Sequence, residues 1–117
     1  MRKERSSTLR LDLHNHTLGS WDCLTDPEAL LAGALARGVD RMAITDHNRL
    51  DVALEMHRRH PERIIPGEEV KTREGIDLIG LFIGTEIPKG TPAKEVCRRV
   101  RDEGGILYLP HPYARGK

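Results

Sequence analysis

Apolar and polar residues follow one another along this chain in patterns that predict β-strands and α-helices in turn. Leu9, Leu11 and Leu13 alternate with polar residues, which is typical of a β-strand. Residues 41–45, 76–83 and 106–109 are more continuously apolar and also predict strands. A further strand is predicted at residues 64–70, where two isoleucines precede a Pro-Gly kink and Glu68, Glu69 and Val70 continue the strand. The pattern therefore predicts five strands.

Three helices are predicted between these strands. The first is capped by Thr25 or Asp26 and ends at Gly38. The other two span residues 50–59 and 91–103, and the last begins with a Thr-Pro pair and ends before two glycines. Because strands and helices alternate, we expect parallel strands joined by crossover helices, and therefore an α/β fold.

Length and composition indicate one globular domain. The chain has 117 residues, and residues 2–8 are all charged or polar, so we expect residues 1–8 to be a flexible N-terminus and residues 9–117 to be the domain. Lys and Arg number 19 and Asp and Glu 18, which excludes a polyanion-binding protein driven by bulk charge. Aromatic residues make up 3%, too few for a single-strand stacking surface.

The cysteines and the apolar segments restrict the kind of metal site and the cellular location. Cys23 and Cys97 lie far apart and no CxxC motif is present, which excludes a thiolate zinc site. The longest apolar run, residues 76–83, is too short to cross a bilayer. We therefore expect a cytoplasmic protein with no membrane partner.

The six histidines are the most informative feature of the composition. The side chains that follow or end the predicted strands are mostly histidines and carboxylates: Asp12, His14, His16, Asp46, His47, Glu68, Glu69 and His111. In parallel α/β sheets the carboxyl ends of the strands meet at one edge, where ligands bind. The two other histidines, His57 and His60, are expected to face solvent on a helix.

This arrangement favours a metal site over a set of unrelated surface histidines. His14 and His16 are two residues apart in extended chain, so both imidazoles point the same way and can reach one cation. Nitrogen and oxygen donors without thiolate suit Zn, Mn or Fe, and a mixture of carboxylates with histidines suggests more than one ion. Asp22 is a further candidate ligand, or else a turn residue.

Four motifs in this order resemble the PHP family, the polymerase and histidinol phosphatase superfamily. They are residues 12–17 (DLHNHT), 44–48 (ITDHN), 66–70 (PGEEV) and 109–112 (LPHP). The resemblance runs from Leu9 to the end of the chain. It implies a distorted (β/α)7 TIM-like barrel, of which about five strands are present here.

The resemblance also implies two or three divalent metal ions. His14, His16 and Glu69 would bind the first ion. Glu69 would bridge to a second ion, which His111 would also bind. Glu69 rather than Glu68 matches the family's Gly-x-Glu spacing.

Other residues acquire roles from the same resemblance. Asp22 and His47 would bind the third ion, and Asp12 and Asp46 would orient imidazoles through the nitrogen that does not ligate. His47 and His111 are the candidate proton donors wherever metal does not engage them fully.

Two departures from the family pattern affect these expectations. Family members often have a histidine where Asp77 stands, and a carboxylate there could still bind metal through oxygen. The family also has a late Asp-x-His motif, whereas Asp12-Leu13-His14 is the only such motif here. About five strands cannot close a barrel of seven, so we expect a domain that is incomplete at its C-terminus and a chain that is a poor catalyst by itself.

The function that the resemblance implies is metal-dependent hydrolysis of a phosphate ester by metal-activated water. The expected substrate is a nucleotide, a short oligonucleotide or a small phosphomonoester. One alternative is a catalytically inactive PHP module with a structural role. A less favoured alternative is an amidohydrolase, for which Lys71 is the one lysine at a suitable strand end. An open last strand also leads us to expect self-association.

Overall fold

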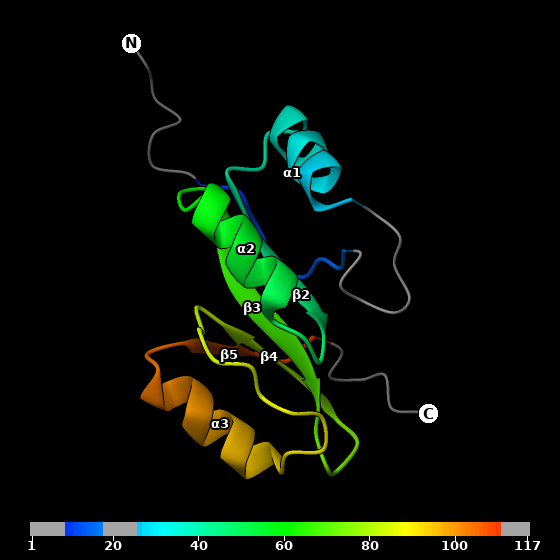
Figure 1. The fold of residues 1–117 in the computed structure, drawn as a ribbon, viewed down its shortest axis with the longest axis vertical. Coiled ribbons are helices and arrows are strands. Elements are labelled where there is room, and N and C mark those ends of the chain that lie inside the picture. Colours follow the sequence, from blue (N-terminus) through cyan, green and yellow to red (C-terminus); the bar gives the residue numbers. More distant parts are fainter. Residues whose placement is uncertain (1–8, 18–25, 111–117) are drawn as a thin grey trace.

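The computed structural model describes residues 9–17 and 26–110. Within them, strands and helices follow one another in the predicted order (Figure 1). The elements are β1 (Leu11–Asp12), α1 (Pro27–Ala36), β2 (Arg41–His47), α2 (Asp51–Arg59), β3 (Ile64–Lys71), β4 (Asp77–Leu81), α3 (Ala93–Asp102) and β5 (Ile106–Tyr108). The predicted α/β class is confirmed, and residues 1–8, expected to form a flexible end, lie outside the described residues.

The strands form one curled, mixed sheet in the order β1-β2-β3-β4-β5. Strands β1, β2 and β3 are parallel, whereas β4 is antiparallel to both of its neighbours, β3 and β5. The expectation of parallel strands is therefore confirmed for β1, β2 and β3 and wrong for β4. The reason is the connection between β3 and β4, which consists of residues 72–76. A parallel pair needs a crossover of about a dozen residues, so this short turn can only form a hairpin.

The hairpin still leaves the ends of the strands that carry most predicted site residues at one edge of the sheet. Because β4 runs backwards, its first residue Asp77 pairs with Lys71, the last residue of β3. Helix α3 then crosses back, so that Ile106 at the start of β5 pairs with Leu81 at the end of β4. The carboxyl ends of β1, β2, β3 and β5 therefore share an edge with the amino end of β4.

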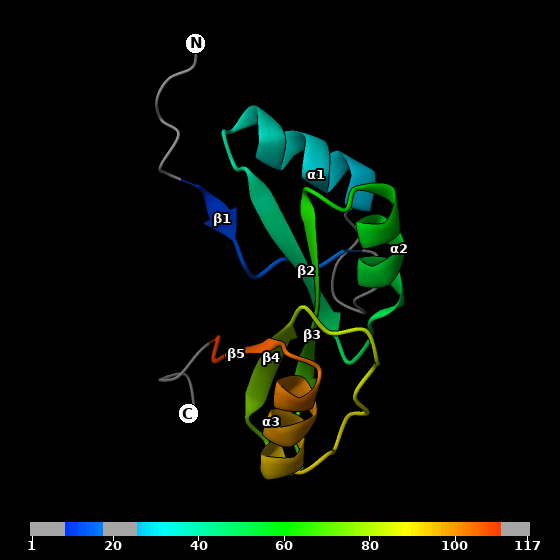
Figure 2. The ribbon, with the colours of Figure 1, turned by 90° about the vertical axis from the view of Figure 1, so that its left-hand side faces the viewer.

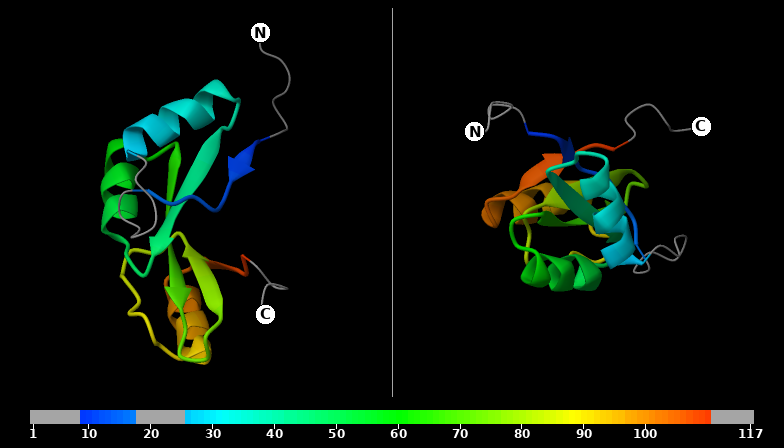
Figure 3. Two further views of the ribbon diagram at one scale, coloured as in Figure 1. Left: turned by 90° about the vertical axis from the view of Figure 1, so that its right-hand side faces the viewer. Right: turned by 90° about the horizontal axis from the view of Figure 1, so that it is seen from above.

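All three helices pack on one side of the sheet, its outer side (Figures 2 and 3). The main core joins them to outward side chains of the strands: Met42, Ile44, Ile64, Val70 and Leu78 contact a cluster that includes Leu31, Met56 and Val96. The inner side holds a smaller cluster of Ala43, Ile65, Ile79 and Leu81, against which Leu13 and Tyr108 pack. The alternation of side chains in each strand produces these two separate clusters.

Two glycines allow β3 and α3 to approach β4 closely. A Cβ atom on Gly67 would lie 2.8 Å from the Gly80 carbonyl oxygen, so glycine is needed where β3 bends against β4. A Cβ atom on Gly80 would lie 2.8 Å from a methyl carbon of Val100, so α3 can pack directly on the strand.

The helix ends are stabilised both locally and by distant residues. Asp26 caps α1 as expected, since its carboxylate accepts a hydrogen bond from the Ala29 N–H at 3.0 Å. Helix α2 has no side-chain cap of its own at Leu50, and Glu86 from the loop before α3 accepts the Leu50 N–H at 2.9 Å instead. Tertiary contacts thus replace a cap that the local sequence lacks.

The two histidines near the end of α2 are engaged with neighbouring elements. His60 Nε2 lies 3.1 Å from a carboxylate oxygen of Glu28 on α1, and Arg59 contacts the same carboxylate at 3.1 Å. His57 Nδ1 lies 2.8 Å from the Ile64 carbonyl oxygen. Both histidines are partly exposed, as expected, and each also contacts a neighbouring element because α1 and β3 pack against this end of α2.

The two edge strands of the sheet, β1 and β5, expose apolar side chains. Leu11 of β1 is 50% exposed, and Ile106 of β5 is 55% exposed. Exposed edge strands of this kind are templates for pairing with another chain.

We expect the chain to self-associate through β5. An Ile106→Lys substitution should shift the chain toward monomer, because a charged side chain on an edge strand opposes edge-to-edge pairing. The measurement is molar mass by light scattering after gel filtration. Leu54→Lys, at an exposed position on α2, is the control. A wild-type chain that is monomeric at all concentrations and melts cooperatively would contradict the prediction.

Candidate metal centre

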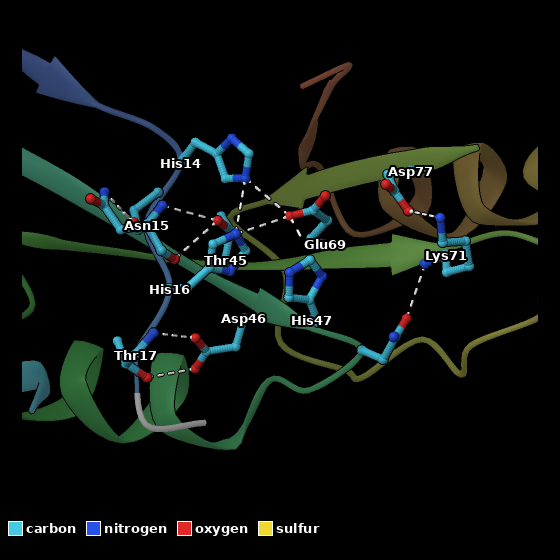
Figure 4. A network of polar contacts seen from close by, with 12 residues as sticks. His14, Asn15, His16, Thr17, Thr45, Asp46, His47, Glu69, Lys71 and Asp77 are labelled. Atoms are coloured by element: carbon cyan, nitrogen blue, oxygen red, sulfur yellow. Dashed lines mark hydrogen bonds and ion pairs between the residues drawn. The ribbon is translucent and has the colours of Figure 1, made fainter. Parts of the chain in front are cut away.

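The segment that follows β1 crosses the end of β2 and carries the two histidines of the HxH motif. Asn15 fastens it to β2: its side-chain amide donates to the Ala43 carbonyl at 2.9 Å, and its backbone N–H donates to Thr45 Oγ1 at 3.2 Å. The Thr45 N–H donates in return to the Asn15 carbonyl at 2.7 Å. Asn15 faces β2, and the alternation of extended chain therefore turns His14 and His16 toward Glu69 (Figure 4).

His14, His16 and Glu69 bring three donor atoms together. His14 Nε2 lies 3.1 Å from His16 Nε2, and Glu69 Oε1 lies 3.0 Å and 3.2 Å from these two atoms. Within the described part of the chain, they form a group of ligand atoms close enough to share a metal ion. Four ligands at 2.0–2.1 Å from a tetrahedral zinc ion are separated by about 3.3 Å. The donor group therefore fits a divalent ion in chemistry and in spacing.

Glu69 is the central residue of this group. It is 1% exposed on the inner side of β3, in register with His47 of β2. Burial raises the pKa of Glu69, but hydrogen bonds from His16 and His14 and the electrostatic influence of His47 outweigh it and lower the pKa to about 2. The carboxylate is therefore ionised at neutral pH, as a metal ligand must be.

His47 lies beside the donor group. Its ring stacks on that of His16, with centroids 4.3 Å apart and an angle of 7° between the planes. Its Nδ1 atom is 3.8 Å from Glu69 Oε1, beyond hydrogen-bonding distance. This predicted residue is thus brought to the centre, close to the three donors.

Asp46 holds the chain directly after His16. Its carboxylate accepts a hydrogen bond from the Thr17 N–H at 2.6 Å and another from the Thr17 hydroxyl at 2.7 Å. Both residues are buried. Sequence reasoning missed Thr17, although it stands in the first motif; the role predicted for Asp46, orienting an imidazole, stays a prediction.

Asp77 lies at the same edge of the sheet as the donor group. Its carboxylate forms an ion pair with Lys71 across the hairpin, with Nζ and Oδ1 3.1 Å apart. Asp77 is not part of the three-residue donor group. The structure therefore supplies a partner for Asp77 that sequence reasoning missed, and its metal role stays a prediction.

Three predicted site residues remain, namely Asp12, Asp22 and His111. Asp12 ends β1 and is half-buried, and its carbonyl oxygen accepts a hydrogen bond from the Asn15 side chain at 3.3 Å. Asp22 and His111 lie outside the described residues, so their predicted roles are untested.

Glu68 faces the opposite, outer side of β3. It is 0% exposed, and its Oε1 atom accepts the Ile87 N–H at 2.8 Å. Its other oxygen has no hydrogen-bond partner among the described residues. Burial raises the pKa of Glu68 to about 7, the Ile87 hydrogen bond opposes this, and the charge of Glu86 adds to it. Two adjacent glutamates thus have opposite environments.

Comparison with known proteins places the chain among relatives. No protein-family model matches it. The uncharacterized protein MJ1587 of Methanocaldococcus jannaschii is 34% identical over an alignment of 119 residues, which covers 91% of this chain and 69% of MJ1587. The chain belongs to the same family as MJ1587.

Two further relatives match this chain over smaller shares of their own length. The uncharacterized protein MJ0417 of the same organism is 37% identical over 105 residues, covering 90% of this chain and 40% of MJ0417. The 5'-3' exoribonuclease Rnm of Escherichia coli is 38% identical over 86 residues, covering 66% of this chain and 29% of Rnm. No helix in the described residues has the length and apolar character needed to cross a membrane.

Proposed function

We propose that this chain is the metal-binding part of a phosphoesterase of the PHP family. The observation that carries the proposal is the convergence of His14, His16 and Glu69 at the carboxyl edge of the sheet. The similarity to a protein named as a 5'-3' exoribonuclease supports phosphate-ester hydrolysis as the reaction class. The proposed substrate is a nucleotide, a short oligonucleotide or a small phosphomonoester.

The proposed cofactors are two or three divalent ions of Zn, Mn or Fe, one of them held by the donor group. When bound, such an ion polarises a phosphoryl oxygen and lowers the pKa of a water molecule toward about 7. The chain itself supplies preorganisation. Glu69 is ionised, and Asn15 and Thr17 clamp the segment that carries both histidines, so little reordering is required when the site is filled.

His47 is proposed as a proton donor to the leaving group wherever a metal ion does not fully engage its ring. It lies within 3.8 Å of Glu69 Oε1, and its side chain is 22% exposed, so it has access to solvent protons. The remaining proposed roles rest on the PHP resemblance: ligands Asp22, His47 and His111, a second proton donor His111, and orienting residues Asp12 and Asp46. Asp77, which the resemblance makes a further ligand, forms an ion pair with Lys71, and this pair supports a different role for Asp77.

We also propose that the described sheet is part of a (β/α)7 barrel. The sheet is curled, its helices lie on the outer side, and the donor residues lie on the inner side. Strands β1 and β5 are the edge strands of the sheet, and in a closed barrel each would pair with a further strand.

The test is metal-dependent hydrolysis of simple phosphate esters. The chain is freed of metal, reloaded separately with Zn²⁺, Mn²⁺ or Fe²⁺, and assayed with p-nitrophenyl phosphate, its bis-ester and a 5'-phosphorylated oligoribonucleotide. We expect hydrolysis that a chelator abolishes and added metal restores. Metal binding without hydrolysis of any of these esters would contradict the enzyme proposal and favour an inactive module.

A further inference from the structure

Lys71 lies beside the donor group on the same strand. It is the last residue of β3, two residues beyond Glu69, and so points to the same inner side of the sheet (Figure 4). With a rise of about 3.3 Å per residue, the Cα atoms of the two residues are about 7 Å apart. A lysine side chain is long enough to bring its ammonium group to a ligand held at the donor group.

The backbone of Lys71 is fixed on both sides. Its N–H donates to Asn48 Oδ1 at 3.0 Å, and its carbonyl accepts the Gly90 N–H at 2.8 Å. Asn48 also donates its own N–H to the Glu69 carbonyl at 2.8 Å, so one residue ties Glu69 and Lys71 together. Asn48 has a φ of 55°, a left-handed conformation that asparagine adopts more readily than most residues.

The ammonium group retains capacity for a further partner. Lysine has three N–H donors. Among the described residues, Asp77 is the partner that the structure gives Lys71 Nζ, at 3.1 Å. The Lys71 side chain is 46% exposed, and ion pairs this exposed are weak enough for an incoming anion to compete.

We propose that Lys71 binds the phosphate group of the substrate next to the metal donors, and that Asp77 orients Lys71 for this role. This inference rests on the proposed function and specifies its substrate as a phosphate-bearing anion. The fixed backbone sets the start of the side chain, Asp77 holds its end at the same edge of the sheet as the donor group, and the ammonium group keeps N–H donors for a phosphate oxygen. Lys71 is thus a point charge for phosphate, as lysine is in many phosphate sites.

The test compares Lys71→Met with wild type and with Lys89→Met, a control at an exposed lysine in the loop before α3. Inorganic phosphate is titrated calorimetrically into the metal-loaded chain, and metal content is measured on the same samples. We expect phosphate binding about tenfold weaker in Lys71→Met, with metal content unchanged and Lys89→Met equal to wild type. Lys71→Arg should recover part of the affinity, because the charge is kept.

Catalysis supplies a second measurement. In Lys71→Met, KM for p-nitrophenyl phosphate should rise about tenfold while kcat changes less, as expected for a residue that binds the phosphate in the ground state as well. Asp77→Asn should leave the metal content unchanged. Loss of a metal ion in this variant would overturn the orienting role and make Asp77 a ligand.

The outcomes separate this inference from the proposed function. Phosphate binding that depends on Lys71, in a chain that hydrolyses no ester, would support the inference and contradict the function. Equal phosphate affinity in Lys71→Met and wild type, or no phosphate binding by wild type, would overturn the inference whether or not hydrolysis occurs.

Discussion

Replacing His14 and His16 together by alanine should remove most of the divalent metal that the chain binds. The substitutions delete two of the three donors that converge within 3.2 Å of one another and leave Glu69 as the remaining one. Loss of a residue that only supports a ligand already weakens metal binding roughly 10–100-fold. Loss of two ligands should therefore exceed that range.

The measurement is metal content by elemental analysis after gel filtration, combined with thermal unfolding. In wild type, metal at 100 times its Kd should stabilise the folded state by about 2.7 kcal/mol, and this stabilisation should be absent in the double variant. A His57→Ala and His60→Ala double variant removes the same number of histidines from the outer side of the sheet and should keep the metal.

A second variant guards against loss of folding. Glu69 is buried, and its carboxylate loses two hydrogen-bonding partners when both histidines become alanine. His14→Gln with His16→Gln keeps amide donors near Glu69 while removing the imidazoles. Metal content equal to wild type in a folded form of either double variant would show that the donor group has been misassigned.

Exchanging each of the adjacent glutamates for glutamine should have opposite consequences. Glu69→Gln removes the central ligand of the donor group and should abolish most metal binding and hydrolysis. Glu68→Gln should leave both nearly unchanged, because Glu68 lies on the outer side of β3 among groups that do not reach the centre. A larger loss of activity in Glu68→Gln would contradict this assignment of the two faces.

Glu68 and Glu69 should also have different effects on how the free energy of unfolding depends on pH. The pKa of Glu68 rises on folding from 4.5 to about 7, so its charged form is less stable in the folded protein. Below pH 4.5 the group is neutral in both states and has no effect. Above pH 7 folding must accommodate the charge, at a cost of at most about 3 kcal/mol, from 2.5 pKa units at 1.36 kcal/mol each.

We therefore expect Glu68→Gln to unfold like wild type near pH 4.5 and to be more stable than wild type by up to about 3 kcal/mol above pH 7. Glu69 has a lowered pKa, so it stabilises the fold above pH 4.5 and loses this effect as the pH falls toward 2. Wild type and Glu68→Gln both contain Glu69, so the difference between their free energies of unfolding reports on Glu68 alone. Urea unfolding from pH 4.5 to 8 provides the measurement, and a pH-independent difference would contradict the raised pKa.

Much of the fold and the centre of the site follows from local sequence. The alternation of apolar residues places the strands, and helix start signals such as Asp26 place α1. His14 and His16 share a direction because extended chain alternates with a period of two, and the same rule places Glu68 and Glu69 on opposite faces. These features depend on neighbours in the chain, so the sequence by itself determined them.

The direction of β4 cannot be read from its side-chain pattern. Side chains alternate with the same period in parallel and antiparallel strands, so the apolar run at 77–81 carries no sign of its direction. The short turn at residues 72–76 was the available signal. Its consequence is the pairing of Asp77 with Lys71, which depends on strand register rather than on any local pattern.

The contacts between distant segments were likewise decided only by packing. Thr17 meets Asp46, His60 meets Glu28, and Glu86 caps α2, and each pair is separated by 29 to 36 residues. Polar groups buried by the fold need partners, and the partner is whichever group the packed chain brings within reach. By itself the sequence indicated which residues are candidates for the site and which way the residues of each strand point. The tertiary structure decided which of them meet, because hydrogen bonds and ion pairs require distances of a few ångströms that only the folded chain sets.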